Sequence, residues 1–113
     1  MNLSWADFEK VIIRAGTIID AEPFPKARKA AYKLTIDFGQ FGIKHSSAQI
    51  TTLYQPHELI GRQVVAVVNF PPKQIADFFS ECLVLGVYNE DNDVVLLQPG
   101  KHVQNGGKVG WCR

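Results

Sequence analysis

The segment of residues 64–68 constrains the fold of this chain more than any other. Four of its five residues are valine, and β-branched side chains favour a strand over a helix. Asn69, Phe70 and two prolines follow, and prolines end a strand because they have no backbone N–H to donate. The junction therefore carries Asn69, Phe70 and Lys73 from a buried strand to an exposed rim.

Several other short segments are predicted to form strands. Residues 32–38 alternate between apolar and polar side chains with a period of two, which is typical of a half-buried strand. Further strands are predicted at residues 11–22, bent at Gly16, and at 43–51, 63–70, 82–88 and 93–98. Short helices are predicted at residues 5–10, with Ser4 as N-cap, and at 53–59, with Pro56 in the first turn or breaking the helix.

This order of elements predicts an all-β fold. A chain of 113 residues fits one compact domain, covering residues 1–113. Five or six strands with one or two short helices favour a small closed antiparallel barrel. The helical segment between the third and fourth long strands favours the five-stranded OB-fold. An SH3-like barrel or an irregular sandwich would show a similar number of strands.

Charge is distributed unevenly along a nearly neutral chain. The net charge is +1, but residues 26–73 contain seven basic and two acidic residues, a local charge of +5. Such asymmetry can gather a basic face on a neutral protein. The alternative is that these charges are scattered over the surface.

Catalytic and metal-binding patterns are missing from the sequence. The two cysteines and three histidines have no zinc-ligand spacing. Neither a nucleophile motif around Ser46 and Ser47 nor a glycine-rich phosphate loop occurs. We therefore expect no enzyme activity, no cofactor and no metal. Without a signal peptide or an apolar run of about 20 residues, the chain is expected to be cytoplasmic and not inserted in a membrane.

Cations with amide, hydroxyl and aromatic side chains suggest a nucleic-acid face, because these groups contact phosphates, base edges and base rings. On the predicted strand 43–51, Lys44 and Ser46 alternate with His45 and Ser47. The candidates for contact with single-stranded RNA are Lys44, Ser46, Ser47, Gln49, Asn69, Phe70, Lys73 and Ser80. In the alternative interpretation, Asn69 is a turn residue and Phe70 belongs to the core.

Aromatic residues suggest a third interpretation, protein binding. Phe70, Phe78 and Phe79 lie in or beside predicted loops, and adjacent Phe78 and Phe79 cannot readily face one core. An exposed apolar rim of this kind marks a partner site or a dimer interface.

Taken together, the segments resemble a known family. Residues 8–10 and 13–18 are similar to its opening motif, and residues 46–51 and 65–81 resemble the CsaA branch of the tRNA-binding OB-fold domains. Related domains are appended to methionyl- and phenylalanyl-tRNA synthetases. The resemblance extends from about Asp7 to Gly110.

The resemblance implies a homodimer built through the ends of the chain. It also implies structure-directed tRNA binding without catalysis. A chaperone role in protein export is implied as well, with unfolded preproteins and the SecA translocation motor as partners. It places Ser46, Ser47 and Gln49 on the RNA face. It adds Asn69, Lys73, Ser80 and Glu81 from a second motif. The chain departs from the wider family at residues 74–78, where an acid, Asp77, and an extra aromatic stand and one cation is missing.

Overall fold

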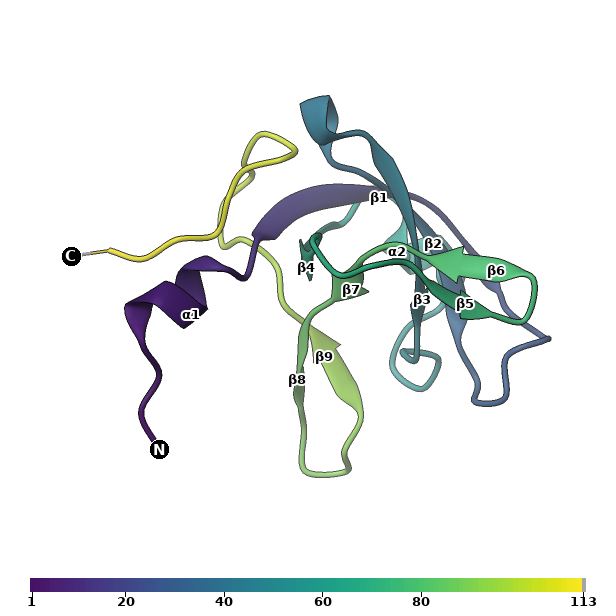
Figure 1. The fold of residues 1–113 in the computed structure, drawn as a ribbon. Helices are drawn as coiled ribbons and strands as arrows, with labels where there is room; N and C mark the ends of the chain where they lie inside the picture. Colours follow the sequence, from purple (N-terminus) through teal and green to yellow (C-terminus); the bar gives the residue numbers. More distant parts are fainter. Residues whose placement is uncertain (113) are drawn as a thin grey trace.

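Strands are the main regular elements of the chain, and five of them form one curled sheet (Figure 1). The structure is a computed structural model that describes residues 1–112. Its five-stranded antiparallel sheet has the order β3-β2-β1-β4-β7. These strands are β1 (Ile13–Pro23), β2 (Tyr32–Asp37), β3 (Ile43–Ala48), β4 (Gln63–Val67) and β7 (Leu83–Val84). Because β3 also contacts β7, the sheet is nearly closed, and the predicted all-β OB-fold is confirmed.

Two small hairpins extend from this barrel (Figure 1). One is formed by β8 (Gly86–Tyr88) and β9 (Val94–Leu96), where the sequence predicted paired strands. The other, formed by β5 (Lys73–Ile75) and β6 (Phe78–Ser80), was not predicted. Its strands have three residues each, and its turn places Ala76 at a φ of 54°, a conformation that glycine usually adopts.

The short helices follow the sequence prediction. In α1 (Trp5–Glu9), the Asp7 backbone N–H donates to Ser4 Oγ at 3.1 Å, so Ser4 is the N-cap. Helix α2 (Pro56–Leu59) begins with its proline, where a missing N–H costs nothing. A 3₁₀ turn, η1 (Gly39–Phe41), connects β2 to β3.

Apolar side chains from β1, β2 and β4 fill the barrel. Ile18, Leu34 and Ile36 are fully buried. Gly16 permits close packing, because a Cβ there would lie 2.7 Å from Ile36 Cγ2. The irregularity in strand pairing that bends β1 lies between Ile18 and Asp20, just beyond the predicted position.

The two ends of the chain lie on the same side of the barrel (Figure 1). The C-terminal segment runs along β1, where Val109 N–H donates to Ile13 O at 2.8 Å. Trp5, Phe8 and Trp111 form an aromatic cluster, with 5.2 Å between the ring centroids of the two tryptophans. In the described part of the chain, helices are too short to span a membrane.

Candidate nucleic-acid interface

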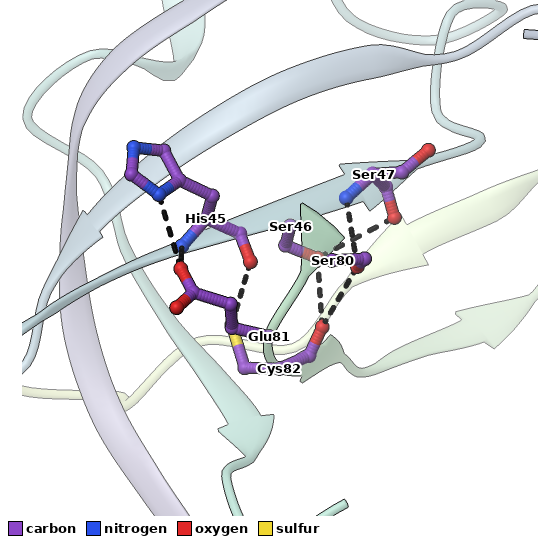
Figure 2. A network of polar contacts seen from close by, with 6 residues as sticks. All are labelled: His45, Ser46, Ser47, Ser80, Glu81 and Cys82. Carbon is purple, nitrogen blue, oxygen red and sulfur yellow. Dashed lines mark hydrogen bonds and ion pairs between the residues drawn. The ribbon is translucent and has the colours of Figure 1, made fainter. Parts of the chain in front are cut away.

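The free edge of β3 is closed by residues 80–82, through side-chain and backbone groups, rather than by a further strand of the sheet (Figure 2). His45 backbone N–H donates to Glu81 Oε1 at 2.9 Å, and Ser47 backbone N–H donates to Ser80 Oγ at 3.1 Å. In return, Glu81 N–H donates to His45 O at 2.7 Å. We call this set the β3 latch; it comprises His45, Ser46, Ser80, Glu81 and Cys82 together with the backbone of Ser47. The latch satisfies backbone donors that an edge strand would otherwise expose.

Ser46 is the buried centre of the latch. Its side chain is fully buried, and its hydroxyl donates to Cys82 O at 3.0 Å (Figure 2). The predicted alternation along β3 is present, but the side that carries Ser46 faces the core while Ser47 lies on the other side. The structure therefore does not bring Ser46 to a surface where RNA could reach it.

Electrostatic effects distinguish two other latch residues. Burial alone would raise the pKa of the Glu81 carboxyl, but hydrogen bonds from the His45 backbone and ring, with the charges of His45 and Lys44, lower it. The His45 Nδ1 atom lies 3.0 Å from Glu81 Oε1. Burial raises the pKa of the Cys82 thiol to about 11, so this thiol stays protonated at neutral pH.

Asn69 also bonds inside the protein. Its Oδ1 accepts from Ile12 N–H at 3.0 Å, and its Nδ2 donates to Lys10 O at 2.6 Å. Both functional ends of the amide therefore fasten the segment after α1 to the segment after β4. These bonds join segments distant in sequence rather than closing a local turn, so Asn69 has a structural role but is not the turn residue of the alternative interpretation.

Beside the latch lies a groove lined by cations and polar side chains. It has a volume of about 610 Å³ and runs between the loop of residues 24–31 and the β5–β6 hairpin. We call it the basic groove; it is lined by Lys26, Ala27, Arg28, Lys29, Ala31, Ser47, Gln49, Lys73, Gln74, Ile75 and Ala76. Four of these residues carry a positive charge, and all four are exposed.

The basic groove contains three of the sequence-predicted residues, namely Ser47, Gln49 and Lys73. Lys44 is half-buried on β3 and does not line it. The motifs missed three cations of the loop, Lys26, Arg28 and Lys29. The signal for them was the local excess of positive charge between residues 26 and 73.

Aromatic packing and an ion pair hold the two walls of the groove together. Phe24 of the loop packs edge-on against Phe78 of the hairpin, with 5.3 Å between ring centroids. Lys33 Nζ lies 4.9 Å from the Phe24 ring centroid and 5.6 Å from that of Phe78. Lys26 Nζ contacts Asp77 Oδ2 at 2.8 Å.

The three phenylalanines predicted to form one rim are separated. Phe78 is half-buried against Phe24, whereas Phe79 is 54% exposed. Phe70 is 56% exposed, which excludes its alternative assignment to the core. It lines an apolar pocket of about 280 Å³ together with Pro71, Lys73, Ser80, Glu81, Cys82 and Leu83. Lys73 therefore lies between this Phe70 pocket and the basic groove.

Comparison with known proteins identifies the family. Residues 13–108 match the family model described as "Putative tRNA binding domain". The chain belongs to this tRNA-binding domain family. Because the match covers the barrel and both walls of the groove, it includes the complete candidate interface.

Solved structures place the chain near one branch of this family. It is 53% identical to chaperone CsaA from Bacillus anthracis, with a TM-score of 0.92 over 97% of this chain and 100% of that one. The CsaA chaperone protein of Picrophilus torridus is 49% identical, with a TM-score of 0.90 over 96% of this chain and 100% of that one. The resemblance to the CsaA branch is thus confirmed.

Curated relatives are much longer proteins. The chain is 32% identical over 108 residues to the methionine–tRNA ligase of Bacteroides fragilis, which covers 96% of this chain and 16% of the ligase. Because the match covers only about a sixth of the ligase, it assigns no catalytic activity to this chain.

Proposed function

We propose that this chain binds tRNA through the basic groove, without catalysing a reaction. The observation that carries the proposal is the gathering of four cations with Ser47 and Gln49 in one groove of a tRNA-binding domain. Lysine and arginine neutralise phosphates, while hydroxyl and amide groups bond to ribose and bases. A groove lined in this way suits an RNA backbone recognised by its shape.

The proposed contact residues differ from those of the sequence prediction. Lys26, Arg28, Lys29 and Lys73 would contact phosphates, and Ser47 and Gln49 would contact ribose or bases. Lys44 would contribute only long-range attraction. Ser46, Asn69, Ser80 and Glu81 would support this face from within, because their polar atoms bond to the protein's own backbone.

Neutralising groove cations tests the proposal. We expect Arg28→Met with Lys73→Met to weaken tRNA binding about tenfold. The slope of log K against log salt concentration should become less steep by about two. Gel shifts at several salt concentrations measure both quantities. Lys101→Met is the matched control, because this exposed lysine does not line the groove. Equal binding by the double variant and the control would refute the groove as the RNA site.

A homodimer is the proposed functional unit. The aromatic cluster at the chain ends supports it, since Trp5 and Trp111 are each about half exposed and line an apolar hollow of about 260 Å³ with Leu3. Sedimentation at micromolar concentration should show a dimer, and Trp111→Ser should shift it towards monomer. A monomeric unaltered chain would refute the dimer.

Polypeptide binding is a second candidate function. Its support is the apolar Phe70 pocket, with exposed Phe70 and Leu83, in a chain similar to proteins described as chaperones. We propose that residues 1–113 form one OB-fold domain that acts in the cytoplasm as an export chaperone for unfolded preproteins, with SecA as a partner.

Suppression of aggregation of a denatured client tests this second function. We expect suppression that is insensitive to salt and reduced by Phe70→Ser, but not by Leu53→Ser, which removes an exposed apolar side chain outside the pocket. If RNA and polypeptide share Lys73, tRNA should compete with the client. If a stoichiometric amount of protein does not suppress aggregation of the client, the proposal of polypeptide binding is refuted and that of tRNA binding is unaffected.

A further inference from the structure

One wall of the basic groove carries a negative charge beside the positive ones. Asp77 is at the tip of the β5–β6 hairpin, and its Oδ2 contacts Lys26 Nζ at 2.8 Å. Lys26 lines the groove from the opposite wall. The carboxylate therefore engages one of the four groove cations before any ligand arrives.

The hairpin presents Asp77 in a defined position. The preceding residue, Ala76, has a φ of 54°, and Ala76 O accepts a hydrogen bond of 3.0 Å from Gln74 Nε2. Packing of Phe24 against Phe78 joins the same two walls independently of the ion pair. Removing the Asp77 charge should therefore change the electrostatics of the groove and leave its walls in place.

Both partners are open to solvent, with side-chain exposures of 66% for Lys26 and 62% for Asp77. An exposed pair of this kind contributes little to folding. An entering phosphate can displace Asp77 from Lys26, but the displaced carboxylate then lies beside the phosphate and repels it.

Ligands differ in whether they have hydrogen-bond donors for the displaced Asp77 carboxylate. RNA carries 2′-hydroxyl and base amino groups, which can donate hydrogen bonds to it. A polyanion that consists of phosphate alone has no such donor. The repulsion between Asp77 and phosphate therefore weakens the binding of a simple polyanion more than that of RNA. A repulsive contact that acts on one ligand more than on another produces specificity.

We propose that Asp77 is a specificity-determining residue of the basic groove, which competes for Lys26 and disfavours polyanions that lack hydrogen-bond donors. The proposal rests on the proposed RNA-binding function of the groove. Asp77 would thus repel phosphate in a groove whose other charged residues attract it.

The test compares tRNA with long-chain inorganic polyphosphate by competition binding at fixed salt. Asp77→Asn is expected to tighten polyphosphate binding about threefold to fivefold and tRNA binding less than twofold. The matched control is Glu90→Gln, which makes the same charge change in the exposed turn of the separate β8–β9 hairpin (Figure 1). It should affect both ligands slightly and equally.

A second pair of variants tests whether Asp77 acts through Lys26. In a Lys26→Met background, Asp77→Asn should lose most of its effect on polyphosphate. Equal effects of Asp77→Asn and Glu90→Gln, or equal gains for tRNA and polyphosphate, would overturn the inference. Absence of tRNA binding by the unaltered chain would instead refute the proposed function, so the two failures are distinguishable.

Discussion

The β3 latch and the basic groove are neighbours on one strand, yet they use their polar side chains in opposite ways. In the latch, the hydroxyl and carboxylate groups of Ser46, Ser80 and Glu81 bond to backbone groups of the protein. In the groove, long cationic side chains extend into solvent from a loop and a hairpin. The latch therefore shapes the surface, and the groove has the free charges to bind an anionic partner.

Asn69→Ala is expected to have the largest effect on stability. Asn69 belongs with the latch residues in its chemistry, because both ends of its amide bond to the chain around Lys10 and Ile12. Loss of two hydrogen bonds should lower the free energy of unfolding by about 2 kcal/mol, measured by urea denaturation. The tRNA affinity of the folded variant should not change.

Gln49→Ala is the matched control for Asn69→Ala. Gln49 is an exposed amide in the basic groove, so its removal should weaken tRNA binding and leave stability unchanged. If Asn69→Ala also weakened binding without destabilising the fold, Asn69 would be an RNA contact, as the sequence predicted.

Two adjacent serines of β3 are expected to differ in the same way. Ser46→Ala removes the hydroxyl that donates to buried Cys82 O and should cost about 1 kcal/mol of folding free energy. Ser47→Ala keeps the backbone N–H that donates to Ser80 Oγ, so it should leave the free energy of folding nearly unchanged. In binding assays the order reverses, because only Ser47 lines the groove. Identical behaviour of the two variants in both assays would contradict the distinction between latch and groove.

The barrel could be predicted from the sequence because its strands have local signals. Alternation in residues 32–38 and the valines of residues 64–68 mark segments that the structure forms as β2 and β4. The β5–β6 hairpin has no comparable signal. One of its short strands, β6, contacts β3, which is distant in sequence, and its turn uses Ala76 where glycine would be expected.

The candidate site could be predicted in composition but not in orientation. Motif positions such as Ser46 and Glu81 are polar, and polarity alone does not reveal whether a side chain bonds to a ligand or to its own backbone. The loop cations, including Arg28, match no motif, so only the local charge indicated them. Burial and hydrogen-bond partners, which depend on tertiary structure, separate the two groups.

The smallest expected effect concerns acid stability and the Glu81 carboxyl. The bonds from His45 hold the pKa of folded Glu81 below its ordinary value of 4.5. The unfolded chain therefore binds a proton more readily, and the latch contributes stability above about pH 4.5 that is lost as pH falls through the lowered pKa. Since the Glu81 side chain is 36% exposed, solvent screening limits the effect to less than about 1 kcal/mol.

Thermal unfolding between pH 6 and pH 3 measures this contribution. The unaltered chain should lose a few degrees more in Tm over this range than Glu81→Gln, which cannot titrate there. Glu90→Gln should follow the unaltered chain, because Glu90 lies on an exposed turn outside the latch. At pH 7, Glu81→Gln should bind tRNA as the unaltered chain does, since the amide oxygen can still accept from the His45 N–H. A loss of tRNA affinity with an unchanged dependence of Tm on pH would instead identify Glu81 as an RNA contact.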